Sequence, residues 1–348
     1  MLIIYSEKHQ LHDPPTYFNM GRQDPFPETP SRALSVVKAI ERRNIGDLIP
    51  PTDFGLDPIL AIHSQDYYEY LKTSYAQWVK LGGNPVGVIP DTFATNLTTT
   101  QKKQRKESTN WFVKPGMFTF DTSAIIVENT FEAAYTGAQV ALTACTKLVN
   151  DGLSSTFALC RPPGHHSTVD LAGGFCYFNN AAIAAQYMIN HFQAKVVVLD
   201  VDYHHGNGTQ AIFYQKQNPL FVSLHGQDDY PFYWGSKDET GEGEGEGYNI
   251  NIPLPAGTKD DSYLQELKKV INDHIIPYNP THVVVSLGVD TYSGDPVGAF
   301  DLSTHAFIEI GKLIQTIRKP TVFVMEGGYN VDELGENVCN VLDGFQNV

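Results

Sequence analysis

The sequence has little cysteine and no long hydrophobic run, and both shortages exclude classes of protein. Four of its 348 residues are cysteine, and they lie far apart without a CxxC spacing. This distribution argues against a thiolate zinc site or a disulfide framework, and it favours a reduced, cytoplasmic protein. No window approaches the roughly 18 consecutive apolar residues that a membrane-spanning helix requires. The first residues, MLIIYSEKHQ, form a short apolar run that ends at the charged residue Glu7. This run predicts a first strand rather than a signal peptide, which needs a longer apolar stretch.

Positive charge is also scarce. The chain carries 24 Lys plus Arg against 39 Asp plus Glu, a formal net charge of −15. Such a balance argues against nucleic acid or an anionic membrane as the main partner, and it fits a cationic ligand weakly because many proteins are acidic. With 42% hydrophobic and 11% aromatic residues, the chain has ample material for a large core, which argues against intrinsic disorder.

Short runs of β-branched residues alternate with helical segments along the chain. Runs such as VVVLDV and HVVVSLG are apolar at successive positions, which is typical of parallel strands covered on both faces. The predicted strands are Leu2–Tyr5, Thr156–Cys160, Lys195–Val201, Leu220–Leu224, Tyr248–Ile252, His282–Leu287 and Thr321–Met325. The predicted helices are Ser31–Arg43, Gln65–Val79, Thr130–Asn150, Asn180–Phe192, Asp260–Tyr278, Ser303–Ile317 and Val331–Phe345. This alternation predicts one α/β domain over residues 1–348, with a doubly wound, mostly parallel sheet.

One segment, residues 80–122, departs from this alternation. It is rich in Thr, Asn, Gly, Pro and Lys, and it contains the basic cluster KKQRK at Lys102–Lys106. A connection of this length inside a compact domain is usually functional or disordered. Two interpretations stay open: a solvated surface loop, or an arm that builds an oligomer interface or a wall of an active site.

Polar residues follow four of the predicted strands. In an open parallel sheet, ligands bind beyond the carboxyl ends of the strands. His165 and His166 follow one strand, Asp202 and its neighbours follow a second, Asp290 follows a third, and Tyr329 follows a fourth. A single Asp or His in such a place is more often a cap, a turn or a core residue. Four strand ends with this composition together predict a functional site.

A metal site is the first expectation from this set. Residues two apart in an extended segment project to the same side, so Asp202 and His204 are able to face one point, and Asp290 supplies a third ligand. Two carboxylates and one imidazole without a thiolate suit Zn²⁺, with Fe²⁺ or Co²⁺ possible. Three protein ligands leave a position for water or substrate, which is typical of a catalytic site.

The remaining residues suit hydrolysis of an amide. His165 and His166 are candidates for the general base and acid, with Asp200 and Asn207 orienting them through their second ring nitrogens. A carboxylate behind one imidazole and an amide behind the other should separate the two pKa values and hence the two roles. Tyr329, on a Gly-Gly turn that allows close approach of the backbone, is the candidate donor to the oxyanion.

Six motifs along the chain carry a family resemblance. RPPGHHS, GGFCYFNN, LDVDYHHGNGT, FVSLHG, LGVDT and MEGGYN resemble, in order, the motifs of the zinc-dependent deacetylases of the arginase-deacetylase superfamily. Within that group the chain is most similar to bacterial acetylpolyamine amidohydrolases, which are histone deacetylase-like. The resemblance implies the eight-stranded arginase-deacetylase fold. It also implies one metal ion per subunit, because the HHGNG form resembles the one-metal branch rather than the arginases.

The resemblance also implies roles for individual residues. Zn²⁺ would be held by Asp202, His204 and Asp290, with His166 as the main general base and acid and Tyr329 as the transition-state tyrosine. Phe175 and Tyr230 match the aromatic walls of the substrate tunnel. A structural K⁺ site, largely of backbone carbonyls, would use Asp200, Asp202, His204, Ser223 and Leu224, and a second would lie near Phe213 and Tyr248.

Substrate choice is predicted less completely. In the resembling family, polyamine selectivity comes from acidic groups around the tunnel mouth, and Asp121 and Glu132 fall where such acids would sit. Tyr17 stands near a position where a further glutamate is expected. Val297 stands where a vertebrate polyamine deacetylase has a gatekeeper glutamate. The preferred acetyl position and chain length therefore stay open.

The resemblance implies zinc-dependent hydrolysis of acetylated polyamines or diamines, giving acetate and the free amine. The partner would be a small cationic acetylated amine, with no nucleic acid or membrane involved. The resembling enzymes use the long loop to form a dimer that narrows the active-site entrance, so a cytoplasmic homodimer is expected. Two alternatives remain: a deacetylase of acetyllysine in proteins, and a non-catalytic sensor of acetylated ligands.

Overall fold

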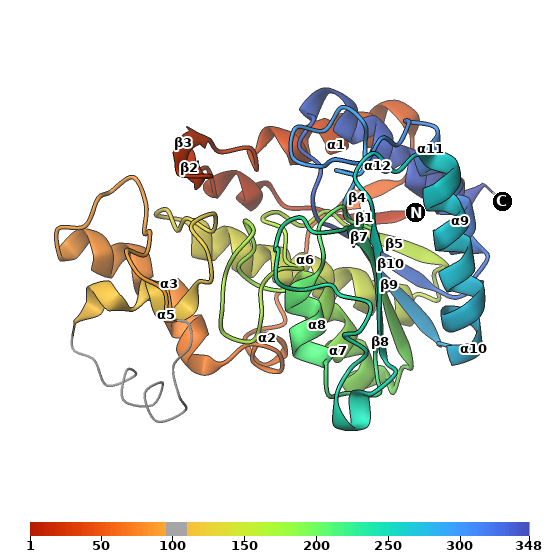
Figure 1. Ribbon diagram of the computed structural model, residues 1–348, viewed down its shortest axis with the longest axis horizontal. Helices are drawn as coiled ribbons and strands as arrows, with labels where there is room; N and C mark the ends of the chain where they lie inside the picture. The colour runs from red at the N-terminus through yellow and green to blue at the C-terminus, as the bar shows by residue number, and fades with distance from the viewer. Residues whose placement is uncertain (95–109, 348) are drawn as a thin grey trace.

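A parallel sheet of eight strands forms the centre of the computed structural model, which describes residues 1–94 and 110–347 (Figure 1). The strand order is β4-β1-β5-β10-β9-β6-β7-β8, and every pairing in this sheet is parallel. The strands are β1 (Leu2–Ile4), β4 (Asp47–Ile49), β5 (Ser155–Ala158), β6 (Val196–Asp200), β7 (Leu220–Gly226), β8 (Asn249–Leu254), β9 (His282–Leu287) and β10 (Thr321–Met325). The predicted α/β fold is confirmed, and the predicted basic cluster Lys102–Lys106 lies outside the described residues.

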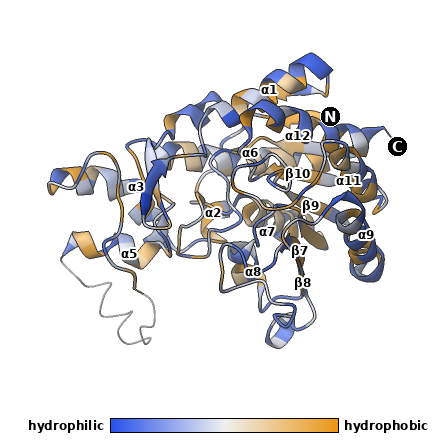
Figure 2. Ribbon diagram, turned by 45° about the horizontal axis from the view of Figure 1, so that its top comes forward, coloured by the Kyte–Doolittle hydropathy of each residue, from blue (hydrophilic) through white to orange (hydrophobic). Residues whose placement is uncertain are grey.

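Two of the central strands, β6 and β10, are buried along their whole length because helices cover both faces of the sheet. Every residue of β6 and of β10 is buried. In β10, Val322 and Val324 pack into the core on one face, whereas Phe323 and Met325 pack into the core on the other. Alternate side chains of a strand point to opposite faces, so a continuous apolar run is needed where both faces are covered. Figure 2 shows the hydrophobic residues concentrated in these strands, while α1 alternates between hydrophobic and hydrophilic faces.

Two layers of helices enclose the sheet. The core on one face is built with α1 (Ser31–Arg43), α9 (Asp260–Val270), α11 (Ala306–Gln315) and α12 (Val331–Gln346). The core on the other face is built with α3 (Gln65–Lys80), α6 (Thr130–Asn150), α7 (Asn180–Phe192) and α8 (Asn207–Phe213). Within the described ranges, no helix combines the length and the apolarity that a bilayer span requires.

Several elements differ from the prediction. The predicted helix Asp260–Tyr278 is divided, because α9 is followed by a π-helical turn at Ile271–Ile275 and then by α10 (Ile276–Tyr278). Pro277 explains the change, since proline has no N–H for the regular ladder and its ring clashes with the preceding turn. The helix predicted from Ser303 begins at Ala306.

Short elements were missed because they carry too little periodicity. The strand β4 has three residues, none of them buried, and it lies at the edge of the sheet beside β1. The others are the antiparallel hairpin of β2 (Thr16–Asn19) and β3 (Arg22–Pro25), the helices α2 (Asp57–Leu60), α5 (Pro115–Phe118) and α8, and the 3₁₀ turns η1 (Glu7–Leu11), η2 (Trp111–Val113) and η3 (Gly243–Gly245).

Candidate active site

The predicted site residues meet at one edge of the sheet. The strands β5, β6, β9 and β10 are parallel neighbours, so the segments that follow their carboxyl ends emerge on the same side. These segments carry His165 and His166, Asp202 and His204, Asp290, and Tyr329, all of which are buried. The structure therefore brings together the groups that the sequence placed at four strand ends.

Asp202, His204 and Asp290 form a compact donor set. One potential ligand atom from each lies within 4.8 Å of the others. The His204 Nδ1 atom is 3.3 Å from Asp202 Oδ1 and 3.0 Å from Asp290 Oδ2. Backbone amides fix both carboxylates, since Tyr203 N–H donates to Asp290 Oδ1 at 2.9 Å and Gly327 N–H donates to Asp202 Oδ2 at 2.8 Å.

This donor set fits a divalent metal ion. Burial, together with the negative charge of Asp202, raises the pKa of Asp290 to about 7. Two buried carboxylates that face each other repel, and a cation between them relieves this repulsion. A Cβ atom at Gly327 would overlap the Asp290 carboxylate, so glycine at this position permits the close approach. Oxygen and imidazole donors without a thiolate suit Zn²⁺ and similar ions.

The two histidines have different partners. His165 Nδ1 pairs with Asp200 Oδ2 at 3.0 Å, and His166 Nδ1 pairs with Asn207 Oδ1 at 2.7 Å. Because both partner atoms are acceptors, each Nδ1 carries a proton, and Nε2 of His166 keeps its lone pair. The ring centroids of the pair are 4.0 Å apart.

These partners separate the two pKa values in the predicted direction. Burial opposes the charged form of His165, but the carboxylates of Asp202 and Asp200 outweigh it and raise the pKa to about 10. Burial and the positive charge of His165 hold the pKa of His166 well below its ordinary value. These surroundings therefore favour the protonated form of His165 and the neutral form of His166.

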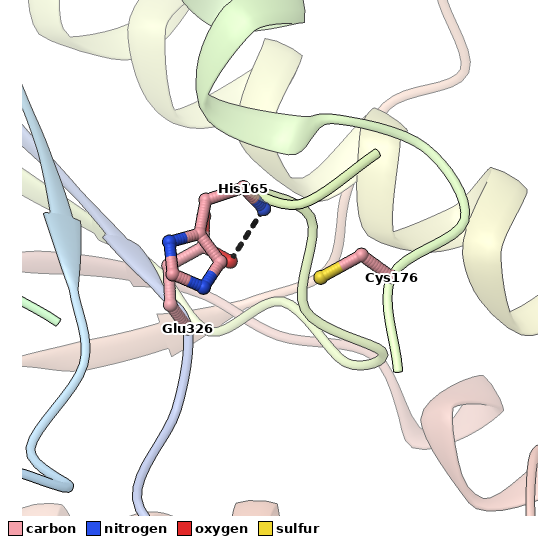
Figure 3. Close-up of side chains that lie close together, drawn as sticks. All are labelled: His165, Cys176 and Glu326. Atoms are coloured by element: carbon pink, nitrogen blue, oxygen red, sulfur yellow. Dashed lines mark hydrogen bonds between the residues drawn. The ribbon is translucent and has the colours of Figure 1, made fainter. Parts of the chain in front are cut away.

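Glu326 anchors the loop that carries the histidine pair. Its Oε2 atom accepts the backbone N–H groups of Gly164 at 2.7 Å and His165 at 3.1 Å. Figure 3 shows this contact, with the Cys176 thiol nearby. His165, Cys176 and Glu326 also form a group with metal-ligand spacing, and all three are buried. Burial raises the pKa of the Cys176 thiol well above its usual range, so the thiolate that a metal needs is disfavoured in this group.

Tyr329 is held from both sides of its turn. Arg32 of α1 donates to the carbonyl groups of Gly328 and Glu326, both at 2.5 Å, and its guanidinium lies 4.8 Å from the Tyr329 ring centroid. On the other side, Asp295 Oδ2 accepts the backbone N–H of Tyr329 at 2.6 Å. Burial raises the pKa of Tyr329 well above its ordinary value, so its hydroxyl keeps the proton that it would donate.

Aromatic side chains flank these groups on two sides. Phe175, Phe26 and Tyr329 form one cluster, with Tyr17 and Val297 packed against it. The ring of Tyr230 lies edge-on to His166, with centroids 5.0 Å apart and an interplanar angle of 90°, and its centroid is 5.9 Å from that of His204. The two predicted tunnel walls, Phe175 and Tyr230, therefore adjoin Tyr329 and the histidines respectively.

The two predicted acids of the tunnel mouth lie in different surroundings. Asp121 accepts hydrogen bonds from the Tyr230 hydroxyl at 2.5 Å and from Gly174 N–H at 3.0 Å. Glu132, in the first turn of α6, forms an ion pair with Lys8 at 2.9 Å, and about half of its side chain (50%) is exposed. Asp121 is therefore bonded to the two predicted walls, whereas the ion-pair partner of Glu132 lies in η1.

The residues of the first predicted potassium site lie at the carboxyl end of β6 and in β7, and those of the second lie at the end of α8 and just before β8. Ser223 in β7 pairs with Asp200 in β6, and Leu224 follows it. Phe213 ends α8, and the carbonyl of Tyr248 accepts the Phe221 N–H at 2.9 Å. Both potassium sites stay predictions.

Sequence reasoning missed the residues that hold the catalytic groups in place. Glu326 and Cys176 lie inside motifs that the sequence analysis used, and Asp295 lies in the SGDPVGAF segment, but nothing in their spacing indicates which atoms they bind. Arg32 and its partner Glu28 are buried and 2.6 Å apart. Glu28 precedes α1, and a buried pair of charges four residues apart has the same sequence spacing as an exposed pair, so no sequence signal distinguishes it.

Comparisons with known proteins indicate the family to which the whole chain is similar. A family profile described as a histone deacetylase domain matches residues 26–345. The chain is 41% identical to acetylpolyamine amidohydrolase 1 of Pseudomonas aeruginosa, covering 99% of each chain, and 36% identical to the acetylpolyamine amidohydrolase of Mycoplana ramosa, again covering 99% of each. A crystal structure of acetylpolyamine aminohydrolase from Burkholderia pseudomallei matches with a TM-score of 0.92 and 37% identity, covering 100% of this chain and 99% of that one.

Proposed function

The chain belongs to the histone deacetylase domain family, and on that premise we propose that it hydrolyses acetylated polyamines or diamines to acetate and the free amine. The observation that carries the proposal is the combination, at one buried edge of the sheet, of a divalent-metal donor set, two differently tuned histidines and a protonated tyrosine. Full-length relatives of 36% to 41% identity that are named acetylpolyamine amidohydrolases support the choice of substrate.

Asp202, His204 and Asp290 would hold the metal ion in this proposal. Zn²⁺ is the ion that the donor set suits best, with Fe²⁺ and Co²⁺ as further candidates. When bound, the ion supplies Lewis acidity, which polarises the acetyl carbonyl and makes the attacking water more acidic. The same carboxylates would otherwise repel each other, so they have an electrostatic reason to bind a cation.

His166 would move the proton in both halves of the reaction. Its Nδ1–H is committed to Asn207 at 2.7 Å, so Nε2 is the atom that accepts the proton of the attacking water. The same Nε2–H then donates to the nitrogen of the leaving amine as the acetyl C–N bond breaks. His165, held at 3.0 Å by Asp200, would remain positively charged and stabilise the negative charge that develops on the acetyl oxygen.

Tyr329 would donate its hydroxyl proton in a hydrogen bond to that oxyanion. Its raised pKa keeps the hydroxyl protonated, and the contacts of its turn with Arg32 and Asp295 preset its position. A donor that is fixed before the reaction stabilises the transition state without a cost of reorganisation.

The walls would accept a slender aliphatic chain. Phe175 and Tyr230 are the proposed sides of the tunnel, and Asp121 and Glu132 are proposed as acids near the distal ammonium groups. We also propose that residues 1–348 form a single domain and that the protein is cytoplasmic. It would bind structural K⁺ at the sites named above and form a homodimer through residues 80–122.

A side-by-side assay tests this proposal. The purified protein is incubated with acetylputrescine, acetylcadaverine, the acetylspermidine isomers and an acetyllysine peptide, and acetate release is measured. The assay is repeated after chelation and after return of Zn²⁺. We expect the small amines to be preferred, and we expect activity to fall on chelation and to recover with Zn²⁺. Preference for the peptide would favour protein deacetylation, and a bound metal without turnover of any acetylated amine would favour a sensor.

A further inference from the structure

The carboxylate of Asp121 is already engaged by its own chain. Oδ1 accepts the backbone N–H and the hydroxyl of Ser123, both at 2.9 Å. Oδ2 accepts Gly174 N–H at 3.0 Å and the Tyr230 hydroxyl at 2.5 Å. A carboxylate offers about four acceptor positions, so these four hydrogen bonds leave little capacity for a substrate ammonium group.

The hydrogen bond from Gly174 N–H to Asp121 holds an unusual turn. Gly174 and Phe175 have φ angles of 54° and 64°, and they are the central residues of a tight turn closed by hydrogen bonds between Gly173 and Cys176. Two consecutive positive φ values are required in a type I′ turn, but they are unfavourable for an aromatic residue such as Phe175. A Cβ atom at Gly174 would overlap the His166 ring, so this turn lies directly against the catalytic histidine.

The hydrogen bond from the Tyr230 hydroxyl to Asp121 holds the second proposed wall. The Tyr230 ring makes edge contacts with His166 and His204, and the ring of Phe120, the residue before Asp121, lies nearly parallel to it at a centroid distance of 6.5 Å. Burial and the Asp121 charge raise the pKa of Tyr230 well above its ordinary value, so the phenol keeps its proton and remains the donor. One short segment therefore braces Tyr230 by stacking and by a hydrogen bond.

We propose that Asp121 is a positioning residue that ties the Gly174–Phe175 turn to Tyr230 and so sets the width of the passage between the two walls. The inference rests on the proposed amide hydrolysis, and it specifies the substrate class as acetamides of unbranched, slender amines. We call these two hydrogen bonds of Asp121, from Gly174 N–H and from the Tyr230 hydroxyl, the clamp. The clamp would select substrates by shape, because it holds both walls whether or not the substrate carries a second charge. If Asp121 instead bound the ammonium group directly, its loss would weaken only substrates that carry a second charge.

The test uses two variants and three substrates with the full-length, zinc-loaded protein. Tyr230→Phe removes the clamp hydroxyl but keeps the ring and the Asp121 charge, and Asp121→Asn removes the charge. The substrates are N-acetylputrescine, neutral N-butylacetamide and bulky N-cyclohexylacetamide. Tyr135→Phe is the matched control, since Tyr135 donates to Asp53 at 2.7 Å in a partly exposed pair that involves none of the site residues.

The clamp predicts the same defect for the charged and the neutral slender substrate. In Asp121→Asn, KM for both should rise by about 10-fold, the order expected for a lost hydrogen bond to a charged group, while kcat changes less. Tyr230→Phe should shift KM in the same direction. In both variants the preference for N-butylacetamide over N-cyclohexylacetamide should fall by up to about 10-fold. Tyr135→Phe should leave all three substrates unchanged.

Two results would overturn the clamp. A defect of Asp121→Asn confined to N-acetylputrescine, with normal kinetics in Tyr230→Phe, would assign Asp121 to the ammonium group. Wild-type selectivity in both variants would show that neither hydrogen bond sets the width of the passage. Calorimetric titration with butanohydroxamic and cyclohexanecarbohydroxamic acids measures the same selectivity without turnover, so the clamp is tested even if the proposed hydrolysis fails.

Discussion

The floor of the site and its walls are built in different ways. The proposed floor consists of Asp202, His204 and Asp290 with the histidine pair, and these residues follow the buried carboxyl ends of strands β5, β6 and β9. The walls, by contrast, come from connecting segments: Tyr230 from the loop after β7 and Phe175 from a turn with positive φ. The sheet therefore places the residues of the proposed chemistry, whereas side-chain bonds between loops hold the proposed walls.

This contrast separates two kinds of mutational effect. A change in the floor removes a charge or a proton from the reacting atoms, so it should act on kcat for every substrate. A change in the walls should act on KM and on the choice among substrates, because it alters contacts made along the substrate chain. The predictions below test this separation, beginning with the floor.

Asp290→Asn should have the largest effect. The amide still accepts the Tyr203 N–H that now bonds to the carboxylate at 2.9 Å, so the fold should be retained. The loss of one of two buried charges should weaken zinc binding and lower kcat by on the order of 1,000-fold. Zinc content per subunit and acetate release at saturating substrate are the measurements.

Asp260→Asn is the matched control, because Asp260 also accepts a backbone N–H, from Ser303 at 2.8 Å, but is only partly buried and lies outside the site. It should retain zinc and activity. One zinc ion per subunit with near wild-type turnover in Asp290→Asn would contradict the assignment of the floor.

Tyr329→Phe should be the next largest effect. Removal of an oxyanion donor typically costs on the order of 100-fold in kcat, and KM should change little because the donor acts in the transition state. The ring, its contact with Phe175 and the backbone bond to Asp295 all remain. Tyr263→Phe, which removes another buried hydroxyl bonded to the Val201 carbonyl at 3.3 Å, should leave kcat unchanged. Equal rates for wild type and Tyr329→Phe, both with zinc bound, would remove Tyr329 from this role.

The sequence predicted that the floor residues lie together, and the structure places them together for a physical reason. Parallel strands with both faces covered need continuous apolar runs, so VVVLDV and HVVVSLG reveal the strands, and the polar residues after them must lie at a common edge. The hydrogen bonds of His165 with Asp200 and of His166 with Asn207 follow from that placement. The same patterns do not report which loops contact each other across the entrance.

The walls and supports show what sequence patterns leave open. Asp121 was predicted as an acid facing the substrate, but the hydrogen bonds of its carboxylate are to Ser123, Gly174 and Tyr230. The edge strand β4 was missed because none of its three residues is buried. The contacts of Arg32 and Asp295 with the Tyr329 turn join segments that are remote in sequence, and the apolar periodicity of one element cannot indicate such bonds.

Asn207→Asp should change the pH dependence of the floor. A carboxylate at 2.7 Å from His166 Nδ1 stabilises the imidazolium and raises the pKa of His166, which burial now holds below its ordinary value. Because His166 must be neutral to accept a proton, the acid limb of kcat/KM should move to higher pH by about one unit. On the acid limb itself, at pH values below both pKa values, activity should then fall by about 10-fold, whereas activity at pH 8 should be largely kept. An unchanged acid limb would assign that limb to another group.

Tyr17→Glu should have the smallest effect, and it should be confined to the walls. Tyr17 packs against the Phe175 cluster from the β2–β3 hairpin, with its ring centroid 5.5 Å from that of Phe175. A partly exposed carboxylate there should lower KM for acetylspermidine by about 3-fold, since an exposed ion pair contributes at most about 1 kcal/mol. The gain should shrink at high salt and should be absent for neutral N-butylacetamide, with kcat unchanged for both. A change in kcat for the neutral amide would mean that the walls also position the reacting atoms, and the separation of floor from walls would then fail.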